Sequence, residues 1–145
     1  MKIRATIAAV GTAAALGLTG TILLPAAAGA GTVTHTLTFT SVQKSAATFS
    51  ANSSGSADLD VNKARKVIGF DMLNFTVNPA TGKVAAGVTV DTAGGFLYGT
   101  LKLSSGPVTH GTVTGGTGAF AGATGTITAT QKSATRTAVT ITYNT

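Results

Sequence analysis

The sequence predicts an all-β protein of about eight antiparallel strands in one domain. All four acidic residues are aspartates, so glutamate, a common helix former, is absent. Apolar and polar residues alternate along most of the chain after residue 31, which is typical of half-buried strands. Turn residues recur about every 8–12 positions, a spacing that favours a β-barrel or a β-sandwich.

The first thirty residues have the layout of a secretory signal peptide. Lys2 and Arg4 form a basic start, Ala5–Leu24 carries no charge, and small residues follow Pro25. We expect cleavage after residue 28 or 30, the alternative being an uncleaved membrane anchor. The predicted organisation is therefore a signal peptide over residues 1–30 and a single β domain over residues 31–145. The mature protein is expected to be secreted and extracellular, with no membrane insertion after cleavage.

The first half of the mature chain predicts three strands. Thr32–Val42 places His35, Leu37 and Phe39 on one face and threonines on the other. The following small, polar stretch, residues 46–56, is expected to be a loop or a weak edge. A short strand over residues 57–61, a basic turn, and a strand over residues 67–77 with apolar residues on both faces come next.

The second half predicts five more strands joined by short turns. The turn at residues 78–82 contains Pro79, which fixes φ, and Gly82, which tolerates positive φ. The expected strands of this half are Lys83–Asp91, Phe96–Leu103, Val108–Thr114, Gly125–Gln131 and Arg136–Tyr143.

A glycine-rich segment, Thr114–Gly125, separates two of these strands. Its first half imitates a dinucleotide-binding loop, but the glycine spacing is wrong and a strand pattern, not a helix, follows. We interpret it as a structural corner in which glycines allow positive φ and close strand approach, with the aromatic residue buried as a plug. The predicted corner residues are Gly115, Gly116, Gly118, Phe120, Gly122 and Gly125.

Three segments resemble one superfamily. Val113–Thr130 (VTGGTGAFAGATGTITAT) is similar to the late glycine signature of the dirigent and allene oxide cyclase-like barrels. Val67–Gly82 resembles the strand and hairpin of secreted bacterial members, and Ala138–Tyr143 resembles their last strand. The resemblance implies an eight-stranded antiparallel β-barrel, often trimeric, with an apolar cavity.

The sequence lacks the residues on which the known chemistry of this superfamily depends. Plant dirigent proteins typically carry Asp and Arg where this chain has Ala119 and Thr124, and allene oxide cyclases rely on a glutamate that is absent. The resemblance therefore implies the fold without either known chemistry.

Three polar residues are candidates for a cavity site. Asp71 shares a face with Leu73 and Phe75, so it is a possible acid or ligand anchor in an apolar cavity. The alternative is a carboxylate hydrogen-bonded near the barrel mouth or facing another subunit. His35 lies on the apolar face of the first strand and is either a ligand contact or a packed residue. Tyr98 is in phase with Phe96, and the sequence leaves its direction open.

Other chemistry is not predicted. The chain has no cysteine, and its two histidines and four aspartates show no metal-ligand spacing, so we expect neither metal nor cofactor. Lys63, Arg65 and Lys66 form a basic cluster that could contact acidic glycans or nucleic acid, but no aromatic residues are interleaved. A solvated loop is the favoured interpretation, and no nucleic-acid partner is expected.

The leading functional hypothesis is a secreted barrel that binds or orients a small hydrophobic molecule without covalent catalysis. One alternative is an isomerase or cyclase that uses Asp71 with Tyr98 or His35. Another is a structural or adhesive cell-surface protein. Apolar residues on outer strand faces also predict a homo-oligomer, and the resemblance favours a trimer.

Overall fold

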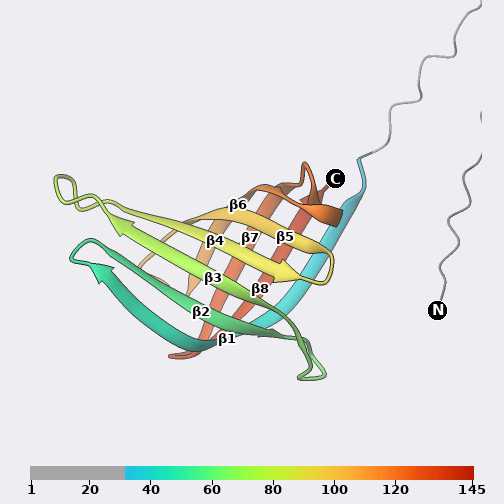
Figure 1. The fold of residues 1–145 in the computed structure, drawn as a ribbon, viewed down its shortest axis with the longest axis horizontal. Coiled ribbons are helices and arrows are strands. Elements are labelled where there is room, and N and C mark those ends of the chain that lie inside the picture. The colour runs from blue at the N-terminus through green and yellow to red at the C-terminus, as the bar shows by residue number, and fades with distance from the viewer. Residues whose placement is uncertain (1–31) are drawn as a thin grey trace, which may run out of the picture. The chain divides into compact units, whose positions relative to one another are not determined.

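The computed structural model describes residues 32–145, so the predicted signal peptide lies outside the described residues. The described chain forms a closed eight-stranded antiparallel barrel, with the strands in sequence order around it (Figure 1). This confirms the predicted fold class. The strands are β1 (Thr34–Ser50), β2 (Ser53–Val61), β3 (Val67–Val77), β4 (Val84–Thr92), β5 (Gly95–Lys102), β6 (Val108–Gly116), β7 (Thr124–Ser133) and β8 (Arg136–Asn144).

The barrel closes between the first and the last strand. β1 pairs antiparallel with β8 from Thr34↔Asn144 to Val42↔Arg136, and beyond that point it continues along β2 alone. Alternation within each strand then decides which residues are enclosed. Within residues 32–145, no helix is long and apolar enough to span a membrane.

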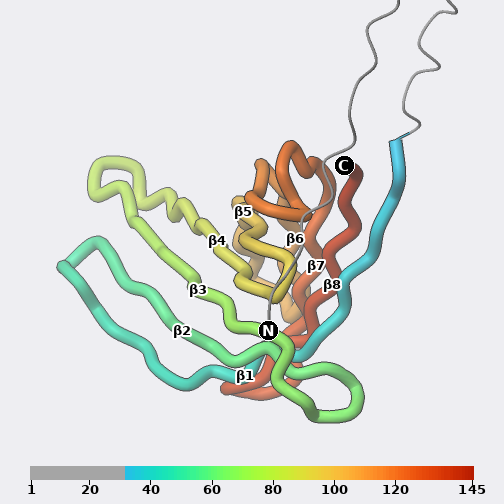
Figure 2. Tube along the Cα trace, turned by 45° about the vertical axis from the view of Figure 1, so that its right-hand side comes forward, coloured from blue at the N-terminus to red at the C-terminus, as the bar shows by residue number. Residues whose placement is uncertain are grey.

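Residues 46–56 were predicted to be a loop or a weak edge, and this prediction is wrong. They form most of a β-hairpin, in which Ala46 pairs with Ser56 and Ser50 with Ser53. β3 pairs with the second arm, with Phe75 opposite Ser54. Backbone pairing on two sides of β2, with β1 and with β3, compensates for the low strand propensity of these small residues. Figure 2 shows this hairpin and the β3–β4 hairpin extending away from β5–β8.

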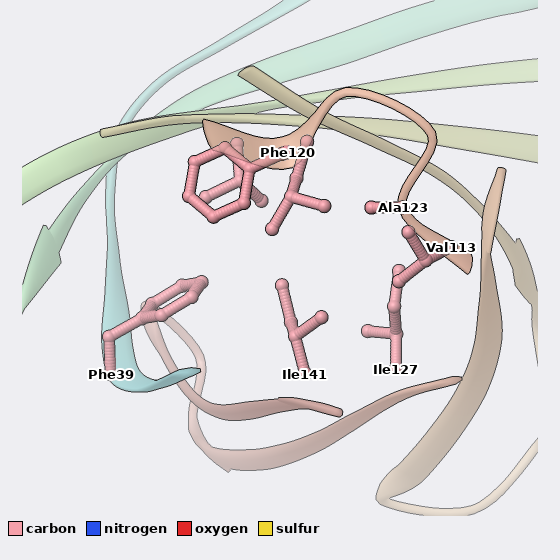
Figure 3. Close-up of a cluster of buried hydrophobic side chains, with 8 residues drawn as sticks. Phe39, Val113, Phe120, Ala123, Ile127 and Ile141 are labelled. Carbon is pink, nitrogen blue, oxygen red and sulfur yellow. The ribbon is translucent and has the colours of Figure 1, made fainter. Parts of the chain in front are cut away.

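The core fills the end of the barrel that is remote from these hairpins. Phe39, Val113, Ile127 and Ile141 point toward one another there, and each is at most 6% exposed (Figure 3). Phe120 covers them from the corner and its ring packs edge-on against Tyr143, with centroids 5.4 Å apart. Apolar side chains therefore close this end of the barrel.

The glycine corner connects β6 to β7. β6 leads into a short 3₁₀ turn, η1 (Gly118–Phe120), which buries Phe120 to 7% exposure. Gly118 has φ of 59°, and a β-carbon there would meet the Gly94 carbonyl. A β-carbon on Gly125 would meet the Thr142 carbonyl of β8. Glycine is required at these two positions by positive φ and by close strand approach.

Candidate ligand site in the barrel

The end of the barrel opposite Phe120 contains a hollow that we call the mouth. It lies inside the β1–β2 hairpin, beside the turn between β7 and β8, and its volume is about 450 Å³. This volume falls within the roughly 300–1,000 Å³ of small-molecule sites. Polar side chains make up just over half of the residues in its wall, and the apolar ones are Leu73, Phe75 and three alanines. The residues that carry polar side chains into it are Gln43, Thr48, Ser54, Ser56, Asp58, Gln131, Thr135 and Thr137.

A smaller cavity lies deeper in the barrel. Its volume is about 60 Å³, and Leu73 and Thr137 line both it and the mouth. The rest of its wall is apolar apart from Ser41 and Asp71. Two water molecules occupy roughly this volume in the liquid, whereas a cavity of about 150 Å³ is known to admit benzene. The body of a ligand therefore fits the mouth, and only a small substituent fits the deeper cavity.

Three carboxyl groups form a buried layer close to these two hollows. Asp58 and Asp60 point inward from β2, and Asp71 points inward from β3, directly opposite Asp58 in the strand pairing. Ser41 of β1 donates its hydroxyl to Asp58 Oδ2 at 2.9 Å. Asp58 lines the mouth and Asp71 lines the deeper cavity. We call these three residues the carboxyl layer.

The surroundings of the carboxyl layer favour protonation. Burial, helped by the neighbouring carboxyl groups of Asp71 and Asp58, raises the pKa of Asp60 from 3.8 to about 9. Burial also raises the pKa of Asp71, and the charge of Asp58 adds to this effect, while contacts with Asp60 and Ser41 act in the opposite direction. At neutral pH the layer therefore holds fewer negative charges than carboxyl groups and presents both donors and acceptors.

Several oxygens of the layer are unpaired. Among the described residues, no amide, hydroxyl or amino donor reaches Asp58 Oδ1, Asp71 Oδ1 or either carboxyl oxygen of Asp60, so a proton on Asp60 can be shared only with Asp71. Leaving a buried polar atom unpaired costs about 1–3 kcal/mol. A ligand that brings a hydrogen-bonding group to Asp58 or Asp71 would recover part of this cost.

The three site residues predicted from the sequence are not brought together. Asp71 is 3% exposed and faces the interior, as one of its two interpretations requires. Tyr98 is 39% exposed on the outer face of β5, where it stacks on Phe96. His35 is exposed near the start of β1, at the Phe120 end, and stacks on Tyr143 with ring centroids 5.2 Å apart. Pairing of Asp71 with Tyr98 or His35 is thus inconsistent with the structure.

Sequence reasoning missed Ser41, Asp58 and Asp60. A signal was present in Ser54, Ser56, Asp58 and Asp60, which alternate with small or apolar residues and so share one strand face. Polar faces of strands usually meet water, and only barrel closure shows that this one faces inward. In the described part of the chain, no group of three or more His, Cys, Asp or Glu residues is placed to hold a metal ion.

Comparison with known proteins finds similarity in structure alone. No family model and no curated protein matches the sequence. A pyocyanin demethylase superposes with a TM-score of 0.62 and 16% identity, covering 75% of this chain and 99% of the other. A pterocarpan synthase dirigent protein superposes with a TM-score of 0.65 and 17% identity, covering 78% and 88%.

This chain has the fold of the dirigent barrels. The superposition and the closed eight-stranded topology together confirm the fold implied by the glycine signature and the strand patterns. At this level of identity the likeness concerns the fold of the dirigent-like barrel and not its chemistry.

Proposed function

We propose that this dirigent-like barrel binds and orients one small, largely hydrophobic molecule in its mouth without forming a covalent bond to it. The observation that carries the proposal is the set of unpaired oxygens in the buried carboxyl layer, next to a hollow of ligand size. Apolar contacts with Leu73 and Phe75 would hold the body of the molecule. A polar substituent would reach Asp58, and its hydrogen bond would fix the orientation.

The fold comparisons support a small-molecule ligand. The names of the two solved structures refer to a pterocarpan and to pyocyanin, which are both small molecules. Holding a reactive molecule in one orientation requires shape and a few polar contacts more than a nucleophile. The polar wall of the mouth modifies the sequence-based expectation of an apolar cavity, because it favours a molecule with hydrogen-bonding groups at its rim.

Native mass spectrometry of protein purified from the cells that naturally make it tests this proposal. The wild-type protein should carry a small molecule. Ser56→Leu, which narrows the mouth, should lose most of it, while Thr112→Leu, at an exposed position on β6, should keep it. Asp58→Asn should retain less of the molecule than wild type. Equal retention by Ser56→Leu would place the molecule elsewhere, and an empty wild-type protein would favour the structural or adhesive alternative.

The isomerase or cyclase alternative is now limited to Asp71. Its raised pKa and its position on the deeper cavity suit a proton donor to a substituent that enters there. Asp71→Asn separates the two functions once the molecule is identified. If the protein only binds and orients the molecule, the Asp71→Asn variant should keep the wild-type product distribution. If Asp71 is an acid catalyst, the variant should still bind the molecule but lose turnover.

A further inference from the structure

The outer surface of the barrel has a second hollow. Its lining is apolar and positively charged, unlike the carboxyl layer. It is a groove of about 370 Å³ across β1, β2 and the start of β8. The floor consists of Val42, Leu59, Val61 and Val67, and three cations surround it. These cations are Lys44, Arg65 and Arg136. No acidic residue lines the groove.

Two irregularities of the backbone coincide with cations of this groove. A β-bulge in β1 inserts Lys44 between Gln43, which pairs with Asp58, and Ser45, which pairs with Ala57. Bulges redirect side chains and are common next to functional sites. Without the extra residue, the side chains of β1 would alternate regularly between the inner and the outer face at this point.

The second irregularity is at Arg65. It has φ of 59°, and among residues 32–145 no other non-glycine residue has positive φ. The turn that holds it is braced by Asn62, whose side chain accepts a hydrogen bond from the Lys66 amide at 3.0 Å. The Arg65 amide itself donates to the Asn62 carbonyl at 2.9 Å. Glycine or asparagine would adopt this conformation more readily, so arginine is kept here at a conformational cost.

We propose that this groove binds an amphipathic anion, with a carboxylate or similar group among the three cations and an apolar body on the valine and leucine floor. Guanidinium groups suit this task because they hold planar oxyanions through two parallel hydrogen bonds. This site is independent of the proposed function in the mouth.

A second copy of the chain suits the groove poorly. Of the ten basic residues, all but Lys2 and Arg4 lie in residues 32–145, whereas three of the four acids are buried inside the barrel. Asp91 is the one acid left on an outer face within these residues. Another copy would therefore bring mainly positive charge to three cations, which a small anion would neutralise.

An NMR titration of the ¹⁵N-labelled protein with 2-naphthoate tests the proposal, and neutral 2-naphthol is the matched probe. Naphthoate should shift the amide signals of Val42, Leu59 and Arg136, and added salt should weaken its binding. Naphthol at the same concentration should not shift these signals. Equal shifts with both probes, shifts at the mouth alone, or no shifts would overturn the proposal.

Variants provide the second part of the test. Arg136→Gln and Arg65→Asn should each raise the dissociation constant for naphthoate about 5- to 10-fold, while Arg65→Lys should retain most of the binding. Lys102→Gln, at the end of β5, is the control and should bind like wild type. Arg65→Asn should melt at the same temperature as wild type or higher, which separates loss of binding from loss of fold. Unchanged binding in both arginine variants would contradict the proposal, as would a change of oligomeric mass in Arg136→Gln.

Discussion

At the residue scale, Asp60 combines complete burial with two neighbouring carboxyl groups. Its side chain has 0% exposure, and both of its oxygens lack an amide, hydroxyl or amino donor among the described residues. A carboxylate in this position would be very unfavourable, so the folded protein keeps the proton. The stability of the barrel is therefore linked to pH through this layer.

The first prediction is that the protein becomes less stable as the pH rises. Between the ordinary pKa of 3.8 and the folded value of about 9, the folded state holds a proton on Asp60 that the unfolded chain has released. The free energy of unfolding should therefore fall by up to about 1.4 kcal/mol per pH unit in this interval. Denaturant unfolding at pH 5, 7 and 9 measures this slope.

Asparagine substitutions identify the residue responsible. Asp60→Asn should flatten the slope and should be more stable than wild type at pH 9, because the amide cannot ionise. Asp91→Asn, on the outer face of β4, should keep the wild-type slope. A wild-type protein that gains stability from pH 5 to pH 9 would contradict this prediction.

At the element scale, the glycine corner closes one end of the barrel. Its 3₁₀ turn is tied to the β4–β5 turn by a hydrogen bond from the Ala119 amide to the Gly94 carbonyl at 2.8 Å. Phe120 projects from this turn onto the core (Figure 3). The corner thus combines a backbone clamp with an aromatic plug.

The second prediction is that the corner contributes stability and not binding. Phe120→Ala should lower the free energy of unfolding by about 3–5 kcal/mol, because it leaves a cavity at the end of the core. Ala119→Ser, at an exposed position in the same turn, should have little effect. Thermal melts of both variants check this. If Phe120→Ala melted like wild type but lost its bound molecule, the corner would be a binding site.

At the scale of the whole barrel, some outer faces are apolar although closure hides only the inner ones. Phe70 and Met72 on β3, together with Phe96 and Tyr98 on β5, are each between 37% and 47% exposed. Cross-strand pairing through Thr89 and Asp91 of β4 places these four side chains in one patch. Apolar patches of this kind often mark a subunit interface.

The third prediction is that the protein forms a homo-oligomer through this patch, with a trimer favoured by the family resemblance. Met72→Lys and Tyr98→Lys should each lower the mass measured by light scattering, because a charge in the patch would be costly to bury. Thr112→Lys, on an exposed part of β6, should leave the mass unchanged. A wild-type monomer at micromolar concentration would contradict the prediction.

The sequence by itself determined the strand pattern, the approximate number of strands and the corner, whereas closure into a barrel was implied by the family resemblance alone. These features depend on local rules: alternation along a strand, turn residues between strands, and glycine where φ is positive or strands approach closely. Asp71 was singled out for the same reason, since its apolar neighbours at two-residue spacing made an inner face one of its two interpretations. The strands within residues 46–56 were not predicted, because their pairing depends on distant partners and not on local propensity.

Only the tertiary structure decided which groups meet. Asp58, Asp60 and Asp71 lie on two strands and Ser41 on a third, and strand register alone brings them into one layer. The outward direction of Tyr98 and the end position of His35 follow from the same closure. The groove of Lys44, Arg65 and Arg136 likewise depends on the β1–β8 seam, which pairs Val42 with Arg136. Long-range pairing is a property of the whole sheet, and a one-residue shift in register would turn each of these side chains to the opposite face.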